Sequence, residues 1–291
     1  CRRTSDMCKE LQEQGYETII QSKTGLKADP YFSASKVKWI MDHVDGVKDR
    51  AREGKLLLGT IDSWLIWKLT SGTVHATDYT NASRTLLFNI HNLQWDDELL
   101  NLFDIPREML PEVKDSNELF GLTEDPSLPI TQLPISGVIG DSQGALFGQK
   151  CFEPGMAKAT YGTGTSVLVQ TGEMVDGTNG LVTSIAWGLN GKVSYALEGI
   201  INSTGDTIKW LKEQLELIDE IGEAEQLACS ISDNQGVYLV PAFVGLGAPY
   251  WKPYTRAAIM GISRNTGKPH IVRAALESIA YQVKDVIELM Q

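Results

Sequence analysis

The sequence predicts an α/β fold, and three features of the chain support that prediction. An apolar, β-prone run from Leu133 leads into Gly140-Asp141, where small residues can begin a helix. From Ala159 to Ser166, a tight Gly-rich turn separates two further β-prone runs. From Pro269 onward, apolar side chains recur at helical spacing, with the proline in the first turn. Strands and helices are therefore expected to alternate along the chain.

Length and composition favour a globular protein with more than a minimal core. The chain has 291 residues, so one large domain or two medium domains are expected. Apolar residues make up 42% of it, which is ordinary for a protein that buries a core. A net charge of −11 argues against non-specific nucleic-acid binding, because that binding needs a basic field.

The pattern of cysteines fits a cytoplasmic location. The four cysteines (Cys1, Cys8, Cys151 and Cys229) are scattered, which favours buried, reduced thiols over disulfides or a metal site. No run approaches the roughly 20 apolar residues that a membrane span needs. Because the chain begins on Cys1-Arg2-Arg3, we expect it to be an internal piece of a longer protein.

The first half of the chain is expected to be rich in helices. Residues 1 to about 55 are predicted to be helical, followed by a short buried strand at 56–60 and a buried helix at 62–69. Trp39, Trp64 and Trp67 are predicted to lie in the core. The polar run 77–84 is predicted to form a loop on the active face, and the later segments are a helix at 95–103 and an irregular region at 111–131.

The second half is expected to be richer in hairpins. The change occurs near 148–155, so we place domains at 1–149 and 150–291. The elements predicted here are a helix at 142–149, strands at 156–160 and 167–170, strands at 183–186 and 193–197 joined by a hairpin turn, a helix at 206–218, a strand at 236–241 and a helix at 269–291.

Asp141 and the turn that contains Gly162, Thr163 and Gly164 together suggest phosphoryl transfer. A carboxylate at the end of a strand lies where open α/β sheets place their ligands. The glycines let backbone N–H groups approach an anion, and the threonine adds a hydroxyl donor. Each feature also has an ordinary interpretation, because Gly-Asp is common as a helix-capping turn and Gly-Thr-Gly as a hairpin. The residues alone leave both interpretations open.

Longer stretches resemble the FGGY family of carbohydrate kinases, and within it most closely the glycerol kinases. The run 31–43 is similar to the first signature of the family. Residues 257–262 and 270–277 are similar to the second signature. Three further runs typical of glycerol kinases are 1–4, 77–85 and 241–251.

The resemblance implies two ribonuclease-H-like domains of the actin/hexokinase type with a cleft between them, both incomplete in this chain. Domain 1–149 would be the later part of the polyol-binding domain, and 150–291 the early part of the nucleotide-binding domain. Three family elements are absent: an N-terminal Asp-x-Gly-Thr phosphate turn, an Arg-Glu pair that grips the polyol, and a Gly-Gly-x-x-x-Asn element near the adenine.

The resemblance also implies roles for individual residues. Asp141 would be the general base that accepts the proton of the substrate hydroxyl. The substrate-binding residues would be Tyr31, Asp141, Ser142, Ser166 and Arg2. The nucleotide-binding residues would be Gly162, Thr163, Gly164, Gly205 and Lys209, although Lys209 stands where glycerol kinases commonly have Gln. No protein ligand for a metal is assigned.

Two departures from the pattern bear on the substrate. Ser142 replaces a Gln, and Ser166 replaces a Phe that would pack against the substrate carbons. The lost apolar contact corresponds to about 1–3 kcal/mol, and the extra room would either admit a longer polyol such as a tetritol or weaken glycerol binding. The expected function is ATP- and Mg²⁺-dependent phosphorylation of glycerol. The alternatives are a kinase for another polyol or sugar and a non-catalytic sugar-binding module, and a homo-oligomer stays open.

Overall fold

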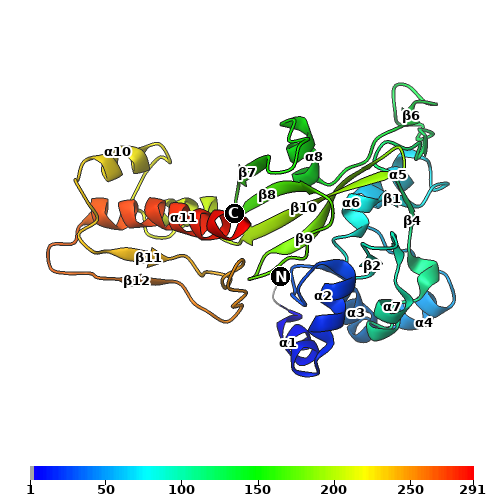
Figure 1. The fold of residues 1–291 in the computed structure, drawn as a ribbon, viewed down its shortest axis with the longest axis horizontal. Coiled ribbons are helices and arrows are strands. Elements are labelled where there is room, and N and C mark those ends of the chain that lie inside the picture. The colour runs from blue at the N-terminus through cyan, green and yellow to red at the C-terminus, as the bar shows by residue number, and fades with distance from the viewer. Residues whose placement is uncertain (1–2) are drawn as a thin grey trace. The chain divides into compact units, whose positions relative to one another are not determined.

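The computed structural model describes residues 3–291, which divide into two compact units (Figure 1). Unit 1 contains residues up to Met156 together with 170–177 and 182–196, and unit 2 contains 157–169, 178–181 and 197–291. None of the helices in this part of the chain is long and apolar enough to cross a bilayer. Cys8 and Cys151 are buried as predicted, whereas Cys229 is exposed; all three are free thiols.

Unit 1 is built mainly from short helices, as the sequence predicts. Aliphatic and aromatic side chains form its core; one cluster joins Ala82, Phe88 and Ile90 to Ile185. The elements are α1 (Ser5–Glu13), α2 (Tyr16–Thr24), α3 (Ser33–His43), α4 (Val47–Arg52), α5 (Ile61–Leu69), β1 (Ala76–Asp78), α6 (Tyr79–Ala82), β2 (Phe88–Asn89), β3 (Gln94–Trp95), α7 (Asp97–Leu102), a 3₁₀ turn (Arg107–Met109), β4 (Glu112–Lys114), β5 (Gly121–Leu122), β6 (Pro134–Ile135), α8 (Asp141–Gly148) and β9 (Val182–Leu189).

The prediction of a polar loop at 77–84 is wrong. Its first residues complete β1, which pairs in parallel with β4, with Ala76 opposite Glu112 and Asp78 opposite Lys114. The short helix α6 follows directly, and the Asp78 side chain caps it by accepting from the Asn81 N–H. The segment is buried because its polar side chains bond to one another and to the backbone, which the composition of the run does not reveal.

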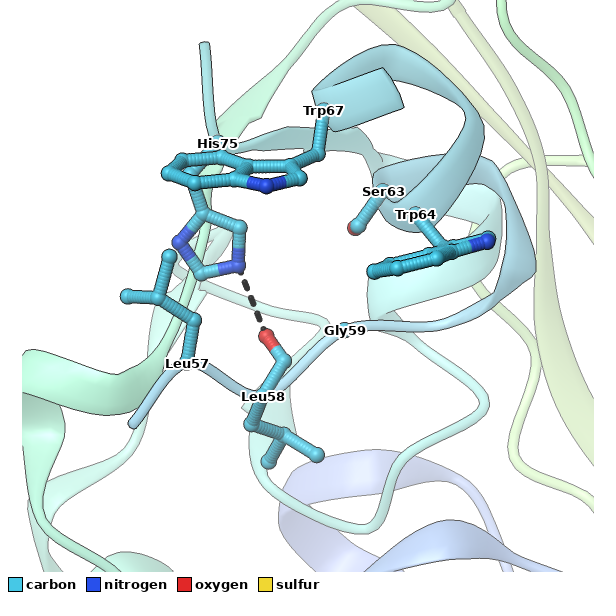
Figure 2. A pocket seen from close by; sticks show the side chains of 7 residues that line it. All are labelled: Leu57, Leu58, Gly59, Ser63, Trp64, Trp67 and His75. Atoms are coloured by element: carbon cyan, nitrogen blue, oxygen red, sulfur yellow. Dashed lines mark hydrogen bonds between the residues drawn. The ribbon is translucent and has the colours of Figure 1, made fainter. Parts of the chain in front are cut away.

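The predicted strand at 56–60 is also wrong. The segment belongs to no strand, and Leu57 is exposed. Its backbone instead makes separate contacts: the Leu58 N–H donates to Met109 O at 2.7 Å, and the Leu58 carbonyl bonds His75 Nε2 at 2.8 Å (Figure 2). Without a neighbouring strand, no ladder forms.

Helix α5 forms where predicted, but it is not a buried helix. Ile66 and Ser63 are buried, whereas Trp64 is 58% exposed, so the prediction that Trp64 lies in the core is wrong. Trp39 and Trp67 are partly buried. A cavity of about 220 Å³ lies beside this helix (Figure 2). It is lined by seven residues, none of which is a predicted site residue: Leu57, Leu58, Gly59, Ser63, Trp64, Trp67 and His75.

His75 is expected to make the protein less stable as the pH falls. Burial lowers the pKa of its imidazole below the ordinary value of 6.5. As pH falls through that value, the unfolded chain takes up the proton first, so the free energy of unfolding decreases. His75→Gln is expected to flatten this dependence in urea denaturation at about pH 7.5 and about pH 5.5. Equal losses of stability on acidification in both proteins would contradict the assignment.

Unit 2 combines a hairpin with a long helix that packs on a small sheet. Strands β7 (Ala157–Tyr161) and β8 (Thr165–Gly172) pair antiparallel, with Tyr161 opposite Thr165. The order β7-β8-β10-β9 gives a four-stranded sheet whose strands β8 and β10 have residues in both units. The other elements are β10 (Lys192–Ile201), α9 (Gly205–Glu213), α10 (Glu223–Cys229), β11 (Tyr238–Val240), β12 (Ala258–Met260) and α11 (Lys268–Met290).

The long C-terminal helix matches its prediction closely. Helix α11 has Pro269 in its first turn and buries Ala275, Val283 and Val286 on the expected face. Figure 1 shows α11 alongside β11 and α10, with which it makes most of its contacts. The helix predicted at 206–218 is shorter, because α9 ends at Glu213.

Candidate functional site

Asp141 is the first residue of α8, and its side chain is exposed. Its Oδ1 accepts from the Ser142 N–H at 2.7 Å, which places the carboxylate at the open end of the helix. The predicted strand leading into it is reduced to β6, and residues 136–140 lie in no strand. The reason is that this segment makes isolated hydrogen bonds instead of a strand ladder. The Val138 N–H donates to Ser116 O, and the Gly140 N–H donates to the side-chain oxygen of Thr80.

Three predicted substrate-binding residues belong to unit 1. The side chain of Tyr31 is 53% exposed, and its ring meets the edge of Phe32 at a centroid distance of 5.2 Å. The Tyr31 N–H donates to Asp29 Oδ1 at 2.8 Å, which fixes the backbone before α3. Tyr31 is therefore accessible to a ligand, as Asp141 is, and Ser142 is partly buried next to Asp141. Arg2 lies outside the residues that the structure describes.

The residues that hold the backbone in front of Asp141 were not among the predicted site residues. Asp78 is fully buried, and its carboxylate accepts hydrogen bonds from Thr80 Oγ1 at 2.8 Å and from Ser116 Oγ at 2.7 Å. The N–H and the Nδ2 of Asn81 donate to the same carboxylate, at 3.0 and 2.9 Å. Burial raises the pKa of Asp78 above its ordinary value, although these hydrogen bonds act to lower it. One signal in the sequence could have pointed to Asp78: it is an Asp followed three residues later by Asn81, and Asp is a residue typical of helix N-caps.

The Gly-rich turn lies between β7 and β8, with Gly162 and Thr163 exposed. The Gly162 N–H donates to Gly164 O at 2.8 Å, which closes the turn. Gly164 must lack a side chain, because a Cβ there would lie 2.3 Å from the carbonyl oxygen of Ile201. The turn is therefore packed against the backbone that follows β10.

Helix α9 begins against this turn. The Gly205 N–H donates to Gly162 O at 3.0 Å, and the Asp206 N–H to Thr163 O at 3.1 Å. A hydroxyl contact of 2.9 Å between Thr165 and Thr204 supports the same junction. The Gly205 amide is therefore bonded within the protein in this structure. Gly205 lets the helix approach the turn, since a Cβ would lie 2.3 Å from Gly162 O.

The remaining two predicted residues have protein partners of their own. Lys209 is exposed on α9 and forms an ion pair with Glu213 one turn later, at 3.8 Å. Ser166 is partly buried on β8, and its hydroxyl donates to Glu198 Oε1 at 2.9 Å. Lys209 and Ser166 belong to unit 2 with the turn, whereas Asp141, Ser142 and Tyr31 belong to unit 1.

Within residues 3–291, no group of three or more His, Cys, Asp or Glu side chains is arranged to hold a metal ion. Mg²⁺ usually binds through one or two carboxylates together with substrate phosphates, rather than in a cage made only by protein. An exposed carboxylate such as Asp141 suits that mode of binding.

Sequence comparison relates both parts of the chain to known proteins. The sequence model of the FGGY family of carbohydrate kinases, N-terminal domain, matches residues 1–148, and that of the C-terminal domain matches residues 157–291. A glycerol kinase of Escherichia coli O139:H28 is 56% identical over 292 aligned residues, which cover 100% of this chain and 58% of the relative. The chain thus spans less than two thirds of the length of that relative.

Solved structures agree with this relationship. The crystal structure of Plasmodium falciparum glycerol kinase with ADP matches with a TM-score of 0.87 and 41% identity, over 99% of this chain and 57% of the other. A xylulose kinase from Lactobacillus acidophilus matches with a TM-score of 0.82 at 20% identity, over 98% of this chain and 58% of the other, which supports the fold alone. The predicted two-domain α/β fold of sugar kinases is confirmed.

Proposed function

This chain belongs to the FGGY family of carbohydrate kinases, and we propose that it acts in transferring the γ-phosphoryl group of ATP to a terminal hydroxyl of glycerol. The products would be glycerol 3-phosphate and ADP. The observation that carries the proposal is the exposed Asp141 carboxylate at the start of α8, in a chain 56% identical to glycerol kinases along its whole length.

Asp141 is the general base of this proposal. The substrate oxygen forms a bond to the γ-phosphorus, while the bond from that phosphorus to the bridging oxygen breaks and its electron pair leaves with ADP. The hydroxyl proton passes to the Asp141 carboxylate. The exposed Tyr31 would pack against the carbon backbone of the polyol and offer its hydroxyl to a substrate oxygen.

Unit 2 is the nucleotide-binding part of this proposal. The turn at 162–164 would face the β- and γ-phosphates, with the exposed Thr163 as a donor. Gly205 would act through shape, because it lets α9 brace the turn. Lys209 would reach phosphate or ribose only by leaving its ion pair with Glu213.

Mg²⁺ would neutralise charge on the transferring phosphates when bound with ATP. Of the residues that the structure describes, Asp141 is the one that we propose to lie near the bound Mg²⁺. A cytoplasmic location and a homo-oligomer remain predictions.

A second candidate is a kinase for a longer polyol, because Ser142 and Ser166 replace larger residues. The test compares kcat/KM for glycerol, a four-carbon polyol and a five-carbon polyol in the full-length protein. We expect glycerol to have the highest value. A longer polyol with the highest value would favour the second candidate, and no polyol-dependent ADP release would favour a non-catalytic sugar-binding module.

Ser166→Phe is expected to reduce kcat/KM for longer polyols more than for glycerol, because the ring would fill space beside the substrate carbons. The matched control is Ser194→Phe, the same change at another partly buried serine on a strand, β10. The measurement is the ratio of kcat/KM for the four-carbon polyol to that for glycerol. An equal ratio in Ser166→Phe and the wild type would contradict a role for Ser166 in selecting the substrate.

A further inference from the structure

We infer that Thr80, held by the buried Asp78, is a positioning residue that sets the location of Asp141 through the backbone N–H of Gly140. The inference rests on the proposed function, because it concerns the same general base. It assigns a task to two residues that touch neither the exposed carboxylate nor the Gly-rich turn in this structure.

The segment in front of Asp141 needs such a support. Residues 136–140 lie in no helix or strand, so no ladder of backbone hydrogen bonds holds them. The Val138 N–H donates to Ser116 O at 2.9 Å, and the Gly140 N–H donates to Thr80 Oγ1 at 2.7 Å. The second bond lies one residue from Asp141, so a displacement of Gly140 would be passed directly to the base.

The bonding of the Thr80 hydroxyl is directional. A hydroxyl has a single proton to donate, and here Asp78 accepts it, with Thr80 Oγ1 2.8 Å from both carboxylate oxygens. The lone pairs of Oγ1 are then the groups left to face Gly140. Donation to a carboxylate also polarises the hydroxyl and makes it a better acceptor.

Asp78 is itself fixed from several sides. Its carboxylate also accepts from Ser116 Oγ at 2.7 Å, and Ser116 Oγ accepts in turn from the Gly188 N–H at 3.2 Å. Ser116 supplies the carbonyl that binds the Val138 N–H. One buried carboxylate therefore connects both bonds that hold the segment leading to Asp141.

The far side of Gly140 is equally close-packed. A Cβ on Gly140 would lie 2.7 Å from Gln143 Oε1 and 3.4 Å from Thr80 Oγ1. Gln143 is buried and its Nε2 donates to Ser184 Oγ at 2.9 Å, so it is not free to yield. Gln143 and Thr80 thus both lie close to Gly140, and the Thr80 hydroxyl is the group that accepts its N–H.

The test compares Thr80→Val with Thr80→Ser and with Thr85→Val in the full-length protein. Thr85 is the matched control, because its hydroxyl is also buried and has the same two kinds of bond. It donates to the Ala82 carbonyl and accepts a hydrogen bond from the Leu87 N–H. We expect Thr80→Val to lower kcat for glycerol phosphorylation by about 10- to 100-fold, because a small displacement of a catalytic group is costly. KM values should stay within about twofold. Thr80→Ser should restore kcat, and Thr85→Val should keep it.

Hydrogen exchange of the Gly140 amide, followed by NMR, gives a readout independent of turnover. It should be protected in the wild type and in Thr80→Ser, and exchange faster in Thr80→Val. A wild-type kcat in Thr80→Val, or an equal loss of kcat in Thr85→Val, would overturn the inference. Lack of polyol-dependent turnover in the wild type would overturn the proposed function instead. The exchange rate of the Gly140 amide in Thr80→Val would then still show whether Thr80 holds Gly140.

Discussion

Asp141→Asn is expected to lower kcat for glycerol phosphorylation by roughly 10²–10⁴-fold, the usual contribution of a general base. The amide keeps the size of the side chain and can still accept from the Ser142 N–H, but it cannot take up the substrate proton. KM for ATP should change little, because we propose that the carboxylate contacts the polyol and not the nucleotide. The measurement is steady-state ADP release at saturating glycerol and Mg-ATP.

The matched control is Asp97→Asn. Asp97 is the exposed first residue of α7, as Asp141 is of α8, so both variants lose a favourable charge at a helix N-terminus. Asp97→Asn also weakens an ion pair with Arg107, in which Asp97 Oδ1 lies 2.9 Å from the guanidinium. Wild-type kcat in Asp97→Asn would show that this lost charge does not explain the effect. A kcat within twofold of the wild type in Asp141→Asn would remove Asp141 from the role of base.

Gly205→Ala is expected to weaken nucleotide binding by about 1–3 kcal/mol, corresponding to roughly 5- to 150-fold in Kd. The new Cβ would lie 2.3 Å from Gly162 O, so α9 and the turn must separate. That movement breaks the bonds from the Gly205 and Asp206 N–H groups to the turn. The measurement is ADP affinity by isothermal titration calorimetry.

Gly222→Ala is the matched control, because Gly222 precedes α10 and a Cβ there meets no atom within 4 Å. It should bind ADP as the wild type does. Wild-type affinity in a folded Gly205→Ala protein would contradict the assignment of the 162–164 turn to the phosphates. Thermal unfolding of each variant shows whether the fold is retained.

Local patterns predicted the elements whose ends carry the proposed chemistry. The small residues after Asp141 predicted α8, and Gly162 and Gly164 predicted the turn between two strands. A proline in the first turn, followed by apolar residues at helical spacing, predicted α11. These signals are contained in single segments, so they do not depend on knowing which parts of the chain meet.

The errors concern contacts between distant segments. The apolar residues of 56–60 favoured a strand, but a strand needs a partner, and Leu58 bonds to Met109 and His75 instead. The aromatic composition of α5 favoured burial, yet composition does not show which side of a helix is covered, and Trp64 is exposed.

The support of Asp141 was hidden for the same reason. Asp78, Thr80 and Ser116 are common polar residues, and Thr80 meets Gly140, and Ser116 meets Asp78, only when segments as many as 60 positions apart come together. The sequence could therefore propose Asp141 as the base, whereas the contacts that hold the backbone in front of it required the structure.

Phosphorus NMR of the full-length protein with Mg-ATP and glycerol tests the central claim most directly. The proposed function predicts that signals of ADP and glycerol 3-phosphate rise together in equal amounts, and that neither rises in Asp141→Asn over the same time. ADP that accumulates with inorganic phosphate alone, or glycerol 3-phosphate formed at an undiminished rate in the variant, would contradict it.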